Sequence, residues 1–410
     1  MVDVHLQVEN IIDICLDKWN NTNNSVSSLI PSFSNKYRRQ KAKSMKVSIN
    51  EVLSSIEAMP EGEANRLAWQ EELKSQLVVQ AKDMLDMGNP KLEDIVLGSF
   101  MDVADSFVSG VQEFDPLIKM IDIMQAMRNV WIMNLIQVMA GRDVEYTQSI
   151  FAYSMLYPYT DNFLDDKSVS SDAKVVFNDR LGRRLSGESI DPMDGNEEKI
   201  YSLLGLIEDQ YDRSLYPHVF ESIICIHEGQ CKSLSQQSAD PARSESDITA
   251  ISCEKGGTSV LADAYLVCED LSENLAQMMF TFGFLLQLID DLQDVDEDTA
   301  GGSITIFTLE VKSHKLDYMA RKLIAFAYTA MDFEELGSPY NDDIRELILS
   351  NCLLMILEAI SKNRKYFSKK FIKDIERYSA ISFSQFKKMK KTIAKRTRNI
   401  DIDSFDRTVK

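Results

Sequence analysis

Glycine and proline are scarce in this chain of 410 residues, which contains 16 glycines and nine prolines. Both residue types interrupt helices, and the other common residues, among them Leu, Ile, Met, Lys and Glu, are good helix formers. Hydrophobic residues make up 44% of the chain, so it can bury a sizeable core. We therefore predict an all-α protein.

Cysteines are also few, and no Cys-x-x-Cys pair occurs among the six. Isolated cysteines in apolar stretches are typical of buried free thiols in a reducing compartment, not of a disulfide framework. The chain has no run of 18 unbroken apolar residues, and it does not start with a basic segment followed by an apolar one. These absences argue against secretion and against a transmembrane segment, so we expect a cytoplasmic protein.

Basic residues are fewer than acidic ones: the chain has 45 Lys and Arg and 64 Asp and Glu, which give a net charge of −19. Repulsion from phosphates argues against nucleic acid as the main partner. Residues 361–400 are the exception: fourteen basic and two acidic residues give +12, which leaves −31 for the rest. This basic tail is compatible with closure over a diphosphate, with peripheral contact to anionic lipid, or with a solvated helix that balances an acidic body.

Helical periodicity and its interruptions divide the chain. Breaks at 60–62 and 88–90 separate helices in the first hundred residues, which carry no chemical motif. We predict a helical cap at 1–110, a catalytic core at 111–340, and C-terminal helices with the basic tail at 341–410.

The most distinctive stretch is 284–298, where an apolar helix ends in carboxylates. Asp290, Asp294 and Asp298 follow one another at intervals of four residues, so they lie along one stripe of a helix, with Asp291 beside them. Like charges at this spacing repel, and apolar surroundings increase the cost. The arrangement therefore predicts a bound cation.

Another acidic cluster, the first in chain order, lies 129 residues upstream. Asp161 and Asp165 are again four residues apart, Asp166 follows them, and an apolar, aromatic segment at 149–156 precedes them. Two such helices facing one cavity would offer only oxygen ligands, which suit Mg²⁺ held by one or two carboxylates and by substrate phosphates. The implied substrate is a diphosphate with an apolar tail.

Two basic residues are candidates to assist the carboxylates in binding the diphosphate. Arg128 lies among apolar residues at helical spacing, so it is either an edge residue or a cation aimed into the cavity. Lys255 precedes the pair Gly256-Gly257, which predicts a helix break that exposes backbone groups to a diphosphate. The alternative is that the glycines only let two helices pack closely.

The run from His227 to Cys231 is similar to a zinc-protease helix motif in which Cys replaces the second His. No third ligand is apparent, so we favour a hydrogen-bonded structural histidine. His227 and Lys232 are nevertheless candidates to line the cavity.

The run from Gln287 to Asp294 matches the Gln-x-x-Asp-Asp-x-x-Asp element of trans-prenyltransferases. Continued to Asp298, it is also similar to the second acidic motif of squalene and phytoene synthases. The first cluster lacks the usual Asp-Asp-x-x-Asp but resembles the Asp-Asn-x-x-Asp pattern of the bacterial class IB, or large, terpene synthases. Over residues 115–335 the chain thus resembles the class I isoprenoid synthase superfamily.

This resemblance implies a helical bundle around a central apolar cavity. It implies that the catalytic carboxylates are Asp161, Asp165, Asp290 and Asp294, and that the Mg²⁺ ligands come from the set Asp161, Asp165, Asp166, Asp290, Asp291, Asp294 and Asp298. The diphosphate would be bound by Arg128, Lys255 and Gln287. Aromatic faces stabilise positive charge, and the candidates to line the cavity are Phe151, Tyr153, Tyr157, Phe280 and Phe284.

The expected enzyme is a Mg²⁺-dependent lyase or transferase of isoprenoid biosynthesis that ionises an allylic prenyl diphosphate, releases pyrophosphate and forms a linear or cyclic terpene. Two departures bear on this expectation. The Asn-Asp-x-x-Ser-x-x-x-Glu triad of terpene cyclases is absent, and the altered first motif favours ionisation of one bound substrate over chain elongation. The sequence leaves open chain elongation, head-to-head condensation, a catalytically silent prenyl-diphosphate-binding relative, a helical interaction scaffold, and a homodimer.

Overall fold

The computed structural model describes residues 3–26, 29–60, 63–85, 89–166, 168–234, 236, 244–313, 316–333 and 339–397. Every regular element within these residues is a helix, and no β-strand occurs among them. The prediction of an all-α protein is confirmed.

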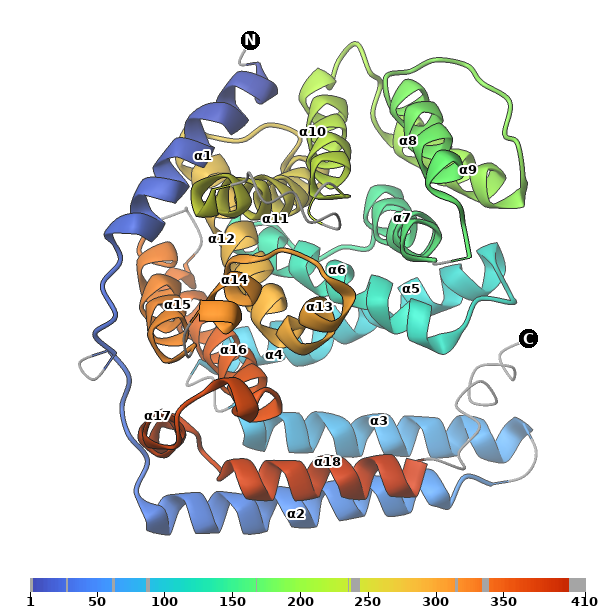
Figure 1. Cartoon of the computed structure of the whole chain (residues 1–410). Coiled ribbons are helices and arrows are strands. Elements are labelled where there is room, and N and C mark those ends of the chain that lie inside the picture. Colours follow the sequence, from blue (N-terminus) through green and yellow to red (C-terminus); the bar gives the residue numbers. More distant parts are fainter. Residues whose placement is uncertain are drawn as a thin grey trace.

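A helical bundle forms the upper part of the molecule (Figure 1), and two antiparallel helices lie at its centre, α11 (Glu245–Cys268) and α12 (Glu273–Gln293). The helices that pack against this pair are α1 (Val4–Asn21), α6 (Met120–Met139), α7 (Gln148–Asp165), α10 (Pro217–Leu234), α14 (Ile306–Ser313), α15 (Asp317–Ala330) and α16 (Asn341–Lys362). The two helices expected to carry the site, α7 and α12, therefore both contribute to one bundle.

The central pair packs closely because glycines face each other. A Cβ atom on Gly283 would lie 2.1 Å from the carbonyl oxygen of Gly256, and one on Gly257 would lie 2.2 Å from the ring of Phe280. α11 is continuous through both of its adjacent glycines. The predicted helix break at Gly256-Gly257 is therefore wrong, and the alternative, close packing of two helices, is confirmed.

Further helices flank this centre. α8 (Ser171–Leu185) packs against α10, and α9 (Gly195–Gln210) packs against α7. α5 (Phe100–Phe114) contacts α6 and α7, and it is preceded by α4 (Pro90–Asp94) and a π-helical turn at Ile95–Ser99.

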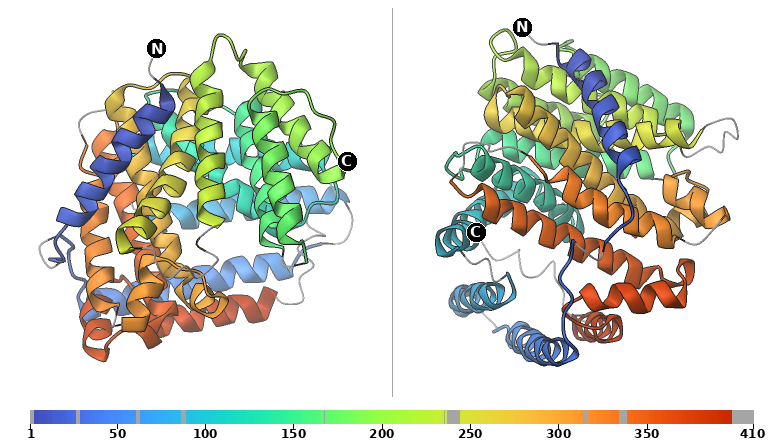
Figure 2. Two further views of the ribbon diagram at one scale, coloured as in Figure 1. Left: turned by 45° about the horizontal axis from the view of Figure 1, so that its top comes forward. Right: turned by 90° about the vertical axis from the view of Figure 1, so that its left-hand side faces the viewer.

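Beneath the bundle lies a layer formed by α2 (Asn35–Glu57), α3 (Glu63–Leu85) and α18 (Phe383–Thr397), seen in Figures 1 and 2. α17 (Lys369–Ile375) connects this layer to α16. α1 packs within the bundle instead, so the first hundred residues divide between the bundle and the lower layer. The domain boundaries at 110 and 340 stay predictions.

Among the described residues, α12 is the one helix that is long and apolar enough to cross a membrane. However, 72% of its apolar window is buried inside the protein. Its central position explains its composition, because a core helix passes the same test.

Candidate functional site

The second acidic cluster lies where α12 ends and α13 (Val295–Gly301) begins. Hydrogen bonds from the backbone N–H of Asp294 to the carbonyl of Asp290 (2.9 Å), and from that of Asp298 to the carbonyl of Asp294 (2.8 Å), carry the four-residue spacing through the junction. The three carboxylates also interact electrostatically. We call Asp290, Asp294 and Asp298 the acidic stripe.

The surroundings of the acidic stripe disfavour its negative charge. The Asp290 side chain is open to water, yet desolvation by the protein around it and then the charge of Asp294 raise its pKa. Desolvation, Asp294 and Asp290 together raise the pKa of Asp298 to about 6. A cation bound at the stripe would lower both pKa values again.

Asp291 lies apart from the stripe, in the interface between α11 and α12. Its Oδ1 accepts a hydrogen bond from Gln287 Nε2 (2.8 Å), and its Oδ2 accepts one from Ser252 Oγ (3.1 Å). Only 5% of the residue is exposed, and desolvation raises its pKa to about 7. An expected metal ligand, Asp291, is thus hydrogen-bonded to an expected diphosphate ligand, Gln287. The hydrogen bond from Ser252 shows that Asp291 faces α11.

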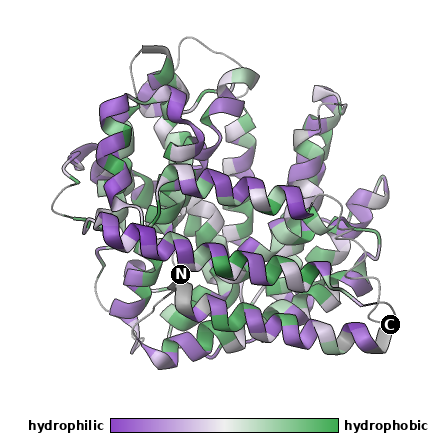
Figure 3. Cartoon of the chain, turned by 90° about the horizontal axis from the view of Figure 1, so that it is seen from below, coloured by the Kyte–Doolittle hydropathy of each residue, from purple (hydrophilic) through white to green (hydrophobic). Residues whose placement is uncertain are grey.

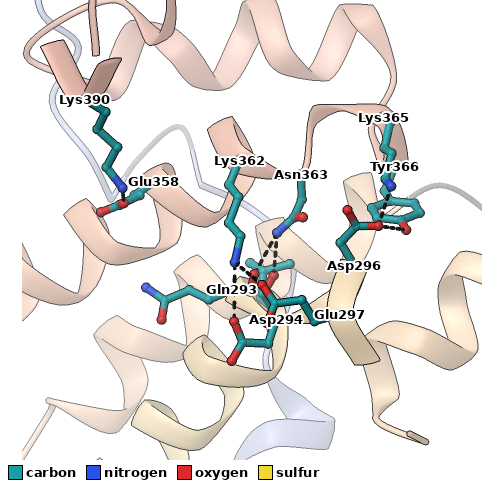
Figure 4. Close-up of polar contacts among 11 residues, drawn as sticks. Gln293, Asp294, Asp296, Glu297, Glu358, Lys362, Asn363, Lys365, Tyr366 and Lys390 are labelled. Carbon is teal, nitrogen blue, oxygen red and sulfur yellow. Dashed lines mark hydrogen bonds and ion pairs between the residues drawn. The ribbon is translucent and has the colours of Figure 1, made fainter. Parts of the chain in front are cut away.

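A lysine from the end of α16 reaches the stripe (Figure 4). Lys362 Nζ lies 3.5 Å from Asp294 Oδ1 and 3.2 Å from Glu297 Oε1. Sequence analysis missed this residue, although it begins the basic segment at 361–400. Asp294, one of the four carboxylates expected to be catalytic, therefore already has Lys362 as its partner.

Two further residues of the same segment hold the α12–α13 junction in place. Asn363 Nδ2 donates hydrogen bonds to the carbonyl oxygens of Leu292 (3.0 Å) and Gln293 (3.1 Å), which α12 leaves free where it ends. Lys365 forms an ion pair with Asp296 on α13. The position of the acidic stripe thus depends on the end of α16.

The first acidic cluster lies at the end of α7. Asp161 is half-buried, and its Oδ1 accepts a hydrogen bond from Gln230 Nε2 on α10 (3.1 Å). The backbone of Asp165 belongs to α7, but its side chain lies outside the described part of the structure. Asp166 is exposed at the end of the helix, where hydrogen bonds from Ser168 lower its pKa.

A pocket of about 80 Å³ lies between α7, α8 and α10. Its lining is mostly apolar, and its polar members include Asp161, Gln230 and His227. Desolvation lowers the pKa of His227, so this histidine is neutral at pH 7. Pockets for small molecules commonly measure about 300 to 1,000 Å³, so a long apolar chain would fit only if lining side chains moved.

Two of the five aromatic residues expected at the cavity, Tyr153 and Tyr157, line this pocket. The hydroxyl of Tyr157 lies 2.6 Å from Ser259 Oγ on α11. The other three are buried and are not part of the lining: Phe151 packs against Phe107 and Phe114, Phe280 contacts Gly257, and Phe284 packs against Trp19 and Phe326.

The two predicted cations lie on helices that pack against the acidic helices: Arg128 on α6, which contacts α7, and Lys255 on α11, which contacts α12. Arg128 is exposed and Lys255 is half-buried, and neither has an ion pair or hydrogen bond to another side chain in the described part of the chain. Desolvation and Asp161 raise the pKa of Tyr157 on α7, and Arg128 opposes this shift. Arg128 and Lys255 likewise oppose the rise at Asp290 on α12, which desolvation causes. The charge of Arg128 therefore lowers the pKa of one residue on each acidic helix, Tyr157 on α7 and Asp290 on α12.

A buried carboxyl that sequence analysis missed lies deeper in the bundle. Asp263 on α11 is fully buried, and its Oδ1 accepts a hydrogen bond from Asn129 Nδ2 (3.0 Å), while Oδ2 has no partner among the described residues. Desolvation raises its pKa well above the usual value, and its charge affects Tyr153 and Tyr157. A lone Asp in the apolar run at 260–268 was the available signal.

Within the residues that the structure describes, no three His, Cys, Asp or Glu side chains converge into a ready-made metal site. Comparisons of the chain with protein-family models, with curated proteins and with solved structures find no match. The resemblance to isoprenoid synthases thus depends on the motif residues alone and stays a prediction.

Proposed function

We propose that the chain is a Mg²⁺-dependent class I isoprenoid synthase that ionises an allylic prenyl diphosphate and releases pyrophosphate. The observation that supports it most is that the acidic stripe lies near two cations, Arg128 and Lys255, which have no side-chain partner among the described residues. Carboxylates alone would repel an anionic ligand, and the two cations alone would repel a metal ion. A diphosphate that carries metal ions satisfies both sets.

The donor set of the stripe fits Mg²⁺. This ion prefers oxygen ligands, usually keeps several waters, and binds one or two carboxylates together with substrate phosphates. Such a site needs no converged cage of protein ligands, so the absence of one among the described residues fits this ion. Asp290, Asp294 and Asp298 would hold Mg²⁺ from the α12–α13 junction, and Asp161 from α7. Bound Mg²⁺ would neutralise the charge that develops on the leaving diphosphate.

The remaining roles fall to side chains around the pocket. Arg128 and Lys255 would bind diphosphate oxygens, and the apolar lining would exclude water from the reacting carbon. The rings of Tyr153 and Tyr157 would face a developing positive charge. Lys362 would have to give up Asp294 in exchange for the metal, while its contact with Glu297 persists.

The proposal includes the isoprenoid synthase fold, a bundle around a central apolar cavity. The antiparallel bundle and the mostly apolar pocket beside Asp161 support it. The size of the pocket requires widening when a prenyl chain enters. Cyclisation, elimination, condensation and elongation would share this first ionisation step.

Two observations favour a second function, that of a prenyl-diphosphate-binding protein without turnover. Lys362 already neutralises Asp294, and the pocket of about 80 Å³ is small for a reacting chain. A protein of this kind would bind the diphosphate through Arg128 and Lys255 and would leave it intact.

The test is incubation with Mg²⁺ and prenyl diphosphates of increasing chain length, followed by pyrophosphate measurement and gas chromatography. Asp161→Ala and Asp294→Ala should each abolish pyrophosphate release but not folding, because each removes one member of a repelling cluster. Asp13→Ala, which removes an exposed carboxylate on α1, is the matched control and should keep full activity. Full activity in either site variant would contradict the proposal. Mg²⁺-dependent binding without pyrophosphate release would support the second function.

A further inference from the structure

The lower layer of the molecule carries a row of exposed positive charge on α2. Lys36, Arg39, Lys43 and Lys46 follow one another at intervals of three or four residues, so they share one face of the helix. All four side chains are exposed, and residues 35–46 contain no acidic residue. α2 buries only Ala42 and Leu53, and the four basic side chains reach water.

α18 presents a second row of the same kind. Lys387, Lys388, Lys391 and Lys395 are exposed, and the helix contains no acidic residue. None of these four lysines, and none of the four basic residues on α2, forms an ion pair with a residue that the structure describes. Lys390 differs, because it pairs with Glu358 on α16 (Figure 4).

The two rows lie on neighbouring, parallel helices. Near the end of α18, the guanidinium group of Arg396 donates hydrogen bonds to Asn50 Oδ1 (3.2 Å) and Glu57 Oε1 (2.7 Å) of α2. Near the start of both helices, the N–H of Phe33 donates to the carbonyl oxygen of Arg377 (2.9 Å). The two helices lie side by side below the bundle (Figure 2), and we call the region of their eight exposed cations the basic face.

Exposed apolar side chains occur on the same two helices, and Val47 shares a face with Lys43, which lies four residues before it. Tyr37 is 43% exposed, Val47 49% and Ile393 38%. Figure 3, which looks at the molecule from below, shows hydrophobic residues alternating with hydrophilic ones along the helices. Cations with apolar side chains between them suit the boundary between lipid headgroups and acyl chains, where phosphate and hydrocarbon are adjacent. A nucleic acid backbone would engage the cations but would leave these aliphatic side chains in water.

The rest of the molecule has the opposite charge. Residues 35–46 carry +6 and residues 361–400 carry +12, so a net charge of −19 leaves −19 − 6 − 12 = −37 elsewhere. An anionic surface would attract the basic face and repel the remainder, which fixes the orientation of the molecule. We propose that the basic face binds the surface of an anionic lipid bilayer, with the helical bundle directed away from it. This inference does not depend on the proposed enzymatic function.

The test is co-sedimentation of the full chain with vesicles of phosphatidylcholine, with and without added phosphatidylglycerol. Each Lys or Arg near an anionic surface contributes roughly a factor of five to binding. Lys387→Glu/Lys391→Glu and Lys36→Glu/Lys43→Glu should therefore each weaken binding to the anionic vesicles at least about 25-fold. Lys91→Glu/Lys119→Glu changes the net charge equally at exposed positions outside the basic face and should bind almost as the wild type does.

Several results would overturn the proposal. These are equal binding to both kinds of vesicle, no binding to either, or equal losses in the control and in the two variants of the basic face. Tighter binding of the wild type to a duplex oligonucleotide than to the anionic vesicles at the same salt concentration would assign the basic face to nucleic acid instead. Thermal unfolding of each variant, followed by circular dichroism, separates lost binding from lost folding.

Discussion

The interface of α11 with α12 and the lower layer of α2, α3 and α18 hold helices together by opposite means. In the former, glycines bring two backbones into contact, and most residues of the two helices are buried. In the latter, α2 buries only Ala42 and Leu53, α18 buries only Phe383, and Arg396 joins the two helices by polar bonds. Close packing therefore holds α11 against α12, whereas solvent-exposed polar contacts hold α18 against α2.

The same difference decides how a carboxylate behaves in each region. Desolvation raises the pKa of Asp291 in the central interface, but a hydrogen bond from Arg396 lowers the pKa of Glu57 in the lower layer. A charge is thus unfavourable where helices meet by shape and favourable where they meet by polar contacts. The effects of substitutions on stability should therefore differ between the two regions in size, and their pH dependence should differ in sign.

The largest effect is expected for Gly283→Ala. The new Cβ atom would lie 2.1 Å from the Gly256 carbonyl oxygen and 3.1 Å from the Gly257 Cα, which are backbone atoms that cannot rotate away. The two central helices would have to separate, so we expect a loss of about 4 to 5 kcal/mol in the free energy of unfolding. Urea unfolding followed by circular dichroism measures it.

Gly205→Ala on α9 is the matched control, because no atom lies within 4 Å of its added Cβ. Alanine is favoured over glycine inside a helix, so this variant should be more stable than the wild type by up to about 1 kcal/mol. Similar losses in both glycine variants would show that close packing of α11 on α12 is not what stabilises the bundle.

The next effect concerns Asp291→Asn and pH. The pKa of Asp291 rises from 3.8 to about 7 on folding, so the folded state binds the proton more tightly, and stability falls as the pH rises from about 4 to 7. Asparagine keeps the shape but not the charge. The metal-free variant should therefore lose less stability than the wild type between pH 5 and pH 8, by about 3 kcal/mol.

Asp296→Asn provides the opposite sign. Hydrogen bonds from Lys365 and Tyr366 lower the pKa of Asp296, so its ionised form stabilises the folded state, and that contribution is lost as the pH falls through the lowered pKa. Asp296→Asn should destabilise the protein at pH 7 and have no effect at strongly acidic pH. The same pH dependence in both variants, measured by urea unfolding, would contradict the comparison.

Local features of the fold and of the candidate site were predictable from sequence. Helix content follows from composition, and the spacing of Asp290, Asp294 and Asp298 determines their shared stripe whatever packs around them. The side that Asp291 faces was not predictable, because an adjacent residue on a helix points about 100° away, and only the partner Ser252 decides whether that direction is buried.

Contacts between residues far apart in the chain could not be predicted from the sequence pattern. Lys362 is 68 residues from Asp294, and nothing in the spacing of either segment indicates that they meet. Phe284 illustrates the same limit. The resemblance implied that it lines the cavity, but Trp19 and Phe326, which are about 300 residues apart in the chain, enclose it in the core.

The smallest effect on global stability is expected for Arg396→Ala. This residue joins α18 to Asn50 and Glu57 of α2, so its loss should free α18 without disturbing the bundle. The urea midpoint should stay close to that of the wild type, while the backbone amides of α18 exchange hydrogen faster. Added salt should shrink the difference in exchange between variant and wild type, because it screens the same contact. A loss as large as that of Gly283→Ala would mean that the lower layer and the central pair unfold as one unit.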